Sequence, residues 1–291
     1  MKYHNLQELE RLATEQEVPL SEIVLEQEME LFDRTREEVY RLLAQHYEVM
    51  EQAVTKALNK EQPTVGNLIS GMAKQQREYA ESGHTICGTT VNLAMALALS
   101  GSEVNASMGR ICAAPTAGAC GILPAVLYTM GKRRQCSRQE VLEALLTASG
   151  VGTVIMRNAT VAGAEGGCQA ECGVAAAMAA AAAVQLAGGT PAQSMQALSL
   201  ALVNCMGLVC DPVAGLVQLP CAQRNASQTV NALTSAELAL GGMKLPMCAD
   251  EVVEAMYRVG KMLPPQLRET AQGGLAATPT GQRIAEKIFG K

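Results

Sequence analysis

The chain has 291 residues, 48% of them apolar, so it can bury a large core. Only 3% of the residues are aromatic and there is no tryptophan. The core must therefore use alanine, leucine, valine, methionine and cysteine, which suit packed helices better than a β-sandwich. The formal net charge is -5 and no long basic run occurs, which argues against a nucleic-acid-binding protein.

The first predicted helical region covers residues 20–59. Apolar side chains from Val39 to Leu58 recur at helical spacing, and the other face is charged, so the region is amphipathic. Thr35 and Glu38 have the spacing of a capping box just before that run.

A break at residues 62–64 precedes a second helix, which is expected to run through Lys74 and end near Gly83. A buried helix is expected next over residues 88–100, with its end at Gly101. Three later helices are delimited by a polar capping residue at the start and by glycine or proline after the end. Their predicted limits are Ser137 with Glu140 to Gly150, Thr234 with Glu237 to Gly241-Gly242, and Asp250 to Met262.

Residues 172–209 carry no charged side chain, which makes a membrane-spanning hairpin the first alternative to consider. The sequence Gly188-Gly189-Thr190-Pro191 divides this stretch, because glycine ends a helix well and Thr190 and Pro191 can start the next. Neither half is rich in large apolar residues or flanked by basic and aromatic anchors. Two buried helices are therefore expected, and no association with a membrane.

No alternation typical of strands and no fixed-period repeat is found. The sequence predicts an all-α fold of roughly ten helices. We expect one domain over residues 1–291, with buried Ala/Gly-rich central helices. Residues 1–60 are expected to form an amphipathic N-terminal helical arm.

The residues from Met1 to Glu10 are polar and lack the apolar segment of a secretory signal. The ten cysteines are dispersed along the chain. Both observations favour a cytoplasmic protein with reduced thiols, in which the simplest role of a cysteine is that of a small buried hydrophobe.

Three loops, at residues 105–121, 163–173 and 204–225, combine glycine or proline with polar residues and cysteine. Such loops on a helical scaffold are where function is expected. They contain no lysine, which argues against pyridoxal phosphate, and the chain has only three histidines. No Cys-x2-Cys pair occurs, so the spacing alone leaves open both an iron–sulfur site and packed free cysteines.

The chain closely resembles, over nearly its whole length, the alpha chain of bacterial iron–sulfur L-serine dehydratases. The resemblance rests on four segments, CAAPTAGACGILPAVL, AEGGCQAEC, GLVCDPVAGLVQLPCAQRNA and LRETAQGGLAATPTG. These segments are long, and the third is especially specific.

The resemblance implies that Cys168, Cys210 and Cys221 hold a [4Fe–4S] cluster. Three thiolates leave one iron with an open position, which can act as a Lewis acid on the hydroxyl of L-serine. The implied products are pyruvate and ammonia. Four neighbouring cysteines do not match ligand positions and are expected to be packing residues, namely Cys112, Cys120, Cys172 and Cys205.

The resemblance also implies a cradle for the substrate carboxylate. Its residues are Thr116, Ala117, Gly118 and Ala119, ahead of a helix expected to start near Gly121, and helix N-termini bind anions. The alternative is a plain helix entry in which Thr116 is a turn residue. Polar residues of otherwise apolar loops are further substrate-binding candidates, namely Asn105, Ser107 and Asn225.

The chain lacks the Ser-Ser-Ser-His-Thr motif and the extra domain of single-chain members, and also the terminal cysteine of some members. It is therefore expected to be half of a two-chain, oligomeric enzyme, whose separate beta chain supplies the base. His84, in Ser-Gly-His-Thr, is the candidate base within this chain, and the alternative is a solvated or capping histidine.

Two other functions stay open. One is a cluster-dependent lyase with a different leaving group, such as a cysteine desulfidase. The other is a cluster-carrying subunit that is inactive without its partner. Release of sulfide from cysteine would favour the first, and activity only after a partner is added would favour the second.

Overall fold

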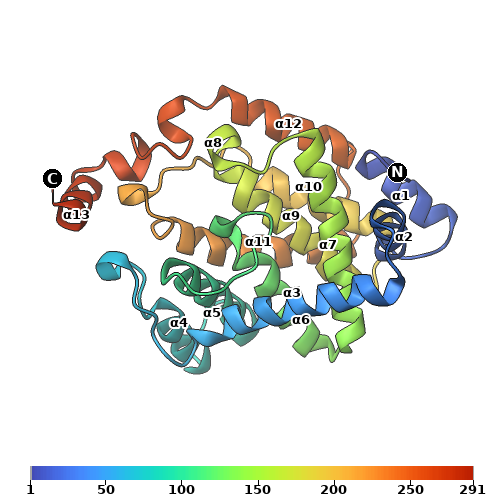
Figure 1. Cartoon of the computed structure of the whole chain (residues 1–291), viewed down its shortest axis with the longest axis horizontal. Helices are drawn as coiled ribbons and strands as arrows, with labels where there is room; N and C mark the ends of the chain where they lie inside the picture. The colour runs from blue at the N-terminus through green and yellow to red at the C-terminus, as the bar shows by residue number, and fades with distance from the viewer. Residues whose placement is uncertain (1, 291) are drawn as a thin grey trace.

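In the computed structural model, which describes residues 2–290, the chain forms thirteen α-helices and no extended strand (Figure 1). The all-α prediction is confirmed. The helices are α1 (Leu6–Glu15), α2 (Leu20–Phe32), α3 (Arg36–Lys56), α4 (Met72–Glu81), α5 (Gly88–Ala106), α6 (Ile122–Arg134), α7 (Arg138–Asn158), α8 (Gly163–Gly166), α9 (Val174–Leu186), α10 (Pro191–Cys205), α11 (Cys221–Leu240), α12 (Ala249–Met262) and α13 (Pro279–Phe289). Helix α1 falls within the helical arm expected over residues 1–60, whereas α8 and α13 were not predicted from the sequence.

Helix α9 is the centre of the fold. It packs against α6, α7, α10 and α11, and its alanines from Ala175 to Ala183 are fully buried (Figure 1). Small side chains let these neighbours approach closely. The segment Gln169–Leu186 is long and apolar enough to cross a membrane, but 89% of it is buried inside the protein. Helices α9 and α10 are thus the two buried helices expected over residues 172–209, with Thr190 as the cap of α10.

The N-terminal region is helical and amphipathic, as predicted, but residues 20–59 do not form one helix. Asp33 adopts a left-handed conformation with φ 50° and ends α2, and the Thr35–Glu38 capping box then starts α3. Leu6 and Ile23 are fully buried in the same core cluster as α9. The N-terminal helices therefore pack onto the body of the protein.

Two glycines expected to end helices lie inside them. Helix α5 continues through Gly101 to Ala106, and α7, which starts at the predicted Ser137–Glu140 capping box, continues through Gly150 to Asn158. A β-carbon on Gly101 would stand 2.8 Å from the Cα of Gly121, and one on Gly150 would stand 2.3 Å from a Val24 methyl. Both glycines permit close helix packing rather than a turn.

Two predicted capping residues act differently as well. Thr234 lies in the middle of α11, where its hydroxyl donates to Val230 O at 2.9 Å. Asp250 lies in the first turn of α12, and its carboxylate accepts hydrogen bonds from Leu6 N and Gln7 N, both at 2.9 Å. Asp250 therefore caps α1 instead of its own helix. The predicted ends at Gly241 and Met262 are confirmed.

The contact between α5 and α6 gives a first testable result. Gly121→Ala is expected to lower the free energy of unfolding by about 1–3 kcal/mol, because a β-carbon there would stand 2.3 Å from Ala98 O. Gly131→Ala is the matched control, since its nearest neighbour is a Val141 methyl at 3.2 Å. Urea unfolding measures both variants. Equal stabilities would contradict the tight backbone contact.

Candidate functional site

The three cysteine-bearing loops meet beside α9. Loop 163–173 folds into α8 and a single π-helical turn, η3 (Gln169–Gly173), which continues directly into α9. Gln169 joins it to the third loop, because Gln169 N donates to Leu208 O at 3.1 Å and Gly207 N donates to the Gln169 side chain at 2.8 Å. The loop at 105–121, which contains the short 3-10 turn η2 (Ala117–Ala119), contacts η3 and α11.

The three predicted ligand cysteines come from different elements. Cys168 immediately precedes η3, Cys210 lies in the loop after α10, and Cys221 is the first residue of α11. Cys168 and Cys210 are buried, and Cys221 is partly exposed. Burial is the main cause that raises the pKa of the other two thiols, and the nearby Cys168 adds to both shifts, so the three sulfurs lie in one neighbourhood.

Arg224, which lies one turn into α11, places a positive charge next to these cysteines. A hydrogen bond from the Cys172 thiol, followed by the charge of Arg224, lowers the pKa of Cys168 despite its burial. The guanidinium is held by Val209 O at 2.7 Å and by Asp211 Oδ1 at 2.8 Å. Arg224 thus offsets negative charge at the buried thiols.

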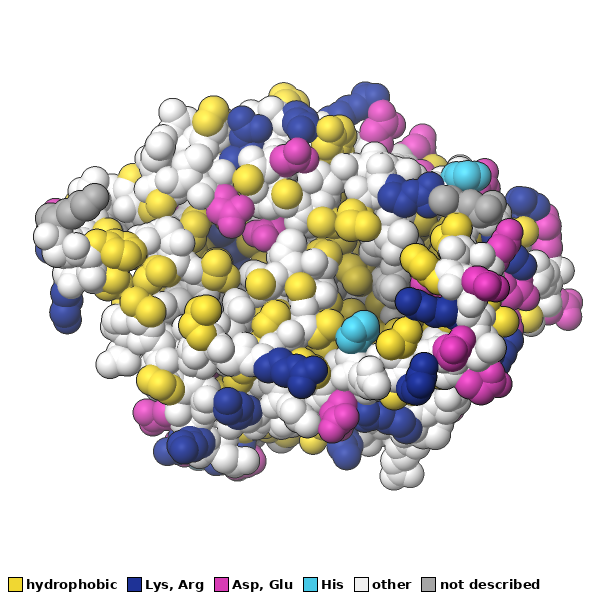
Figure 2. Space-filling model, viewed as in Figure 1, with side chains coloured by type: hydrophobic (Ala, Val, Ile, Leu, Met, Phe, Trp, Pro, Cys, Tyr) yellow, Lys and Arg dark blue, Asp and Glu magenta, His cyan; other side chains and the backbone are white. Residues whose placement is uncertain are grey.

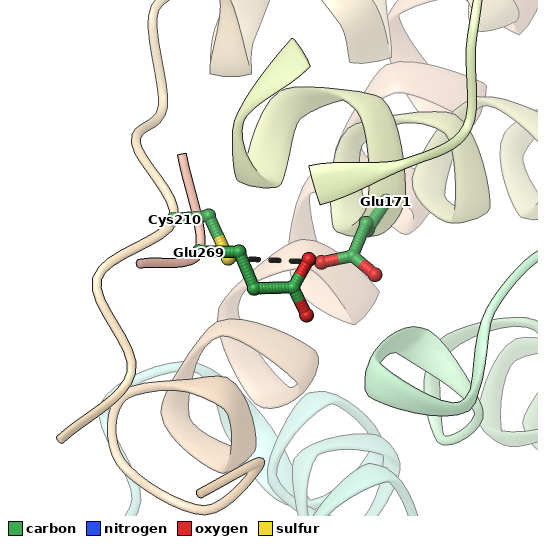
Figure 3. Close-up of side chains that lie close together, drawn as sticks. All are labelled: Glu171, Cys210 and Glu269. Atoms are coloured by element: carbon green, nitrogen blue, oxygen red, sulfur yellow. Dashed lines mark hydrogen bonds between the residues drawn. The ribbon is translucent and has the colours of Figure 1, made fainter. Parts of the chain in front are cut away.

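Two carboxylates stand beside Cys210 (Figure 3). One ligand atom from each of Glu171, Cys210 and Glu269 lies within 4.8 Å of the others, and the Cys210 thiol donates to Glu171 Oε2 at 3.8 Å. Backbone pairing sets this arrangement, since Cys210 N donates to Leu267 O at 2.9 Å and Glu269 N donates to Cys210 O at 2.8 Å. Glu269 has a φ of 64°, an uncommon conformation for a residue with a side chain.

These acidic groups suit a bound cation or metal cluster. Burial and the charges of Glu171 and Cys168 raise the pKa of Cys210 well above its usual range. Burial, followed by Cys168, raises the pKa of Cys221 to about 12. Burial, followed by repulsion from Glu269, raises the pKa of Glu171. Positive charge at the site would reverse these shifts, and thiolates are ligands for iron and zinc.

The distances between the three thiols help to distinguish a site for an iron–sulfur cluster from a site for a single metal ion. Within residues 2–290, the Glu171, Cys210 and Glu269 group alone brings three His, Cys or acidic ligand atoms within 4.8 Å of one another. The sulfurs of Cys168, Cys210 and Cys221 are spread more widely than that. A wider spread fits a multi-iron cluster better than one metal ion.

The predicted substrate cradle borders this cluster. A β-carbon on Gly118 would stand 3.5 Å from Glu171 Oε1 and 3.7 Å from Thr116 Oγ1. The Thr116 hydroxyl is close enough to lower the pKa of Glu171 slightly, yet its buried Oγ1 makes no hydrogen bond of good geometry to a described residue. The N–H groups of Ala117 and Gly118 likewise have no hydrogen-bond acceptor within residues 2–290. The loop therefore offers free donors beside the thiols, whereas Ala119 N donates to Thr116 O at 3.2 Å.

The other predicted polar residues hold this loop or lie away from it. Asn225 is fully buried, donates to Gly118 O at 2.7 Å and accepts from Gly121 N at 3.0 Å, so it ties the loop to α11. Asn105 donates to Ala117 O at 3.1 Å. Ser107 donates only to Val104 O, at the end of its own helix.

His84 lies in the exposed connection between α4 and α5. Its backbone contacts Tyr79 and Ser82, and its side chain makes no hydrogen bond or ion pair to a described residue. The structure does not join it to the three cysteine loops.

The remaining cysteines of the motifs have surroundings that suit packing. Burial raises the pKa of Cys120 and Cys205 to about 12, and a β-carbon on Gly173 would stand 2.5 Å from Cys205 Sγ. Cys172 is fully buried, and its hydrogen bond to Cys168 raises its pKa. Cys112 lines a mainly hydrophobic pocket of about 290 Å³ between α3, α7 and residues 112–115, which is the hollow near the middle of Figure 2.

Four charged residues of the site were missed by the sequence analysis: Glu171, Asp211, Arg224 and Glu269. All four lie inside the four sequence segments on which the resemblance rests. Their role depends on contacts between distant parts of the chain, which no local pattern reveals.

Comparisons with known proteins find relatives over nearly the whole chain. The family model described as serine dehydratase alpha chain matches residues 15–276. A probable L-serine dehydratase alpha chain of Bacillus subtilis (strain 168) is 44% identical over 288 residues, which cover 99% of this chain and 96% of that protein. The L-serine dehydratase alpha chain of Peptoniphilus asaccharolyticus is 48% identical over 273 residues, 94% of each protein. L-serine dehydratase TdcG of Escherichia coli (strain K12) is 37% identical over 280 residues, 94% of this chain but 61% of that longer protein.

Proposed function

Because the chain belongs to the serine dehydratase alpha chain family, we propose that it converts L-serine to pyruvate and ammonia with a [4Fe–4S] cluster held by Cys168, Cys210 and Cys221. The observation that carries the proposal is the convergence of these three thiols from three separate elements, with the Arg224 guanidinium beside Cys168 and Cys221. When bound, such a cluster supplies an iron with an open position that acts as a Lewis acid on the substrate hydroxyl.

The protein contributes charge balance and orientation. Arg224 offsets the negative charge of the thiolates, and Asp211 fixes the guanidinium by an ion pair at 2.8 Å. Asp211 is itself held by Leu275 N at 2.7 Å, so the C-terminal part of the chain supports the site. Burial of Cys168 and Cys210 keeps competing water away from the thiolates.

The cradle at residues 116–119 binds the substrate carboxylate. Its donors are the Thr116 hydroxyl and the N–H groups of Ala117 and Gly118, which lack other partners among the described residues. Asn105 and Asn225 hold this loop in place and act as positioning residues. A carboxylate bound here brings the rest of the amino acid next to Glu171 and Cys210.

The enzyme works in the cytoplasm as an oligomer that includes a separate beta chain. The names of two relatives describe them as alpha chains, which supports a partner chain. Dehydration needs a base to remove the α-proton of serine, and the exposed side chain of His84 has no contact with the site. We therefore place the base on the partner.

The direct test combines composition with turnover. The chain is purified anaerobically with its beta chain, iron and acid-labile sulfide are quantified, and pyruvate and ammonia are measured after serine is added. Four irons and four sulfides per chain with equal amounts of both products support the proposal. A metal-free, fully active protein would contradict it.

The cradle makes a separate prediction. Thr116→Val and Gly118→Val are expected to lower kcat/KM for serine about 10- to 150-fold with the cluster intact, because one hydrogen bond to a charged carboxylate is worth roughly 1.5–3 kcal/mol. Thr129→Val is the control, since Thr129 Oγ1 is also buried and unpartnered but lies on α6. Unchanged serine kinetics in both cradle variants would place the carboxylate elsewhere.

A further inference from the structure

L-Serine carries three polar groups, and the function proposed above accounts for two of them. The carboxylate lies in the cradle and the hydroxyl faces the cluster. The ammonium group still needs a partner, because a charged group taken out of water must be compensated. The partner must be an acceptor that lies between the cradle and the thiols.

We propose that Glu171 binds the ammonium group of the substrate and so selects α-amino acids, an inference that rests on the proposed function. Figure 3 shows the Glu171 carboxylate pointing toward Cys210 and Glu269. Oε1 would be 3.5 Å from a β-carbon on Gly118, in the cradle, and Oε2 lies 3.8 Å from Cys210 Sγ.

Covalent geometry requires such a neighbour. In any α-amino acid the nitrogen lies about 2.4–2.5 Å from the carboxyl carbon, given bonds of about 1.46 and 1.52 Å and an angle near 111°. An ammonium group attached to a carboxylate in the cradle therefore falls within reach of the carboxylate next to Gly118. That carboxylate belongs to Glu171.

The other acidic groups of the site are less well placed. Asp211 is already held by Arg224 and by Leu275 N. Glu269 is exposed and comes from the C-terminal segment, on the Cys210 side of the site. Glu171 is partly buried, accepts a weak hydrogen bond from the Cys210 thiol, and has the Thr116 hydroxyl beside it, so its charge is not balanced by a cation of this chain.

The absence of a side chain at Gly163 leaves room for the Glu171 carboxylate. A β-carbon on Gly163 would stand 2.5 Å from Glu171 Oε2 and 3.2 Å from Cys210 Sγ. Any larger residue at position 163 would displace the carboxylate. The position of Glu171 is thus fixed by its neighbours on both sides, as expected for a residue that orients a ligand.

The test compares two ligands that differ at one group. L-Glycerate has the same carbon skeleton, carboxylate and β-hydroxyl as L-serine, but a hydroxyl replaces the ammonium group on its α-carbon. On anaerobic, cluster-loaded complex with its beta chain, serine binding is measured as the KM for turnover and glycerate binding as its competitive inhibition constant. Glu171→Gln is expected to weaken serine binding about 10- to 100-fold and to change glycerate binding less than about 3-fold, because only serine loses a charge-assisted hydrogen bond.

The control is Glu165→Gln, the same change on α8, where Glu165 is exposed and lies 3.9 Å from Lys261. It should leave both constants unchanged. Glu171→Asp keeps the charge with a shorter reach and is expected to fall between wild type and Glu171→Gln for serine alone. If Glu171→Gln does not fold, the change in serine and glycerate binding in Glu171→Asp tests the role of Glu171 instead.

Three results would overturn the inference. Equal weakening of both ligands would mean that Glu171 only supports the fold, and no weakening would place the ammonium elsewhere. Loss of iron or an altered electron paramagnetic resonance signal in folded Glu171→Gln would make Glu171 a cluster ligand. Failure of the wild-type complex to produce pyruvate from serine would refute the proposed function itself, a distinct outcome.

Discussion

Replacing Cys168, Cys210 or Cys221 with alanine is expected to abolish both cluster binding and serine turnover. Each sulfur is one of three ligands, so its loss leaves two thiolates for a cluster that also keeps an open iron position. Cys168 and Cys210 are buried, so solvent cannot readily replace the missing thiolate. Iron and sulfide content per chain, the visible absorption spectrum and pyruvate formation measure the effect.

The controls are Cys136→Ala and Cys248→Ala, two cysteines that are partly exposed and lie outside the three loops. Both variants should keep a full cluster and full activity. Circular dichroism checks that each ligand variant is folded. A fully loaded and active Cys210→Ala protein would refute the ligand assignment.

The second large effect concerns the partner. The isolated, cluster-loaded chain is expected to turn over serine about 10²- to 10⁴-fold more slowly than the complex with the beta chain, which is the usual contribution of a positioned base. The chain is expected to fold and bind its cluster alone, because the three proposed ligands, Arg224 and the cradle all lie within it. Reconstitution of the chain alone, followed by addition of the beta chain, measures the difference.

His84→Ala separates the two places for the base. With the base on the beta chain, this variant should behave as wild type in the complex, because the side chain is exposed and unpartnered among the described residues. Full activity of the isolated wild-type chain would contradict the two-chain model. Loss of that activity in His84→Ala would then assign the base to this chain.

The fold was predictable where the signal is local. The Thr35–Glu38 and Ser137–Glu140 capping boxes start α3 and α7, as the spacing indicates. Glycine is ambiguous, because Gly150 has the same local signal whether it ends a helix or admits a neighbour such as Val24. That choice depends on tertiary packing, which the sequence around the glycine does not contain.

The site was predictable only in part for the same reason. The resemblance identified the three thiols and the cradle, and the structure places these residues together. It did not identify Glu171 and Glu269 as neighbours, because backbone pairing between Cys210 and residues 267–269 brings them side by side. Asn225 was predicted to bind substrate, yet its buried amide holds the cradle loop from α11.

The capping of α1 by Asp250 has a consequence for how the chain folds. The two hydrogen bonds join residues 244 and 243 positions apart, so α1 is capped by a side chain that is synthesised long after it. Contacts of such high sequence separation form late, after most of the closure entropy has been overcome. Helix α1 can pack on α2 early, but its N-terminal cap cannot form until α12 has been synthesised. Docking of α1 is expected to be among the last steps of folding and a target for chaperones.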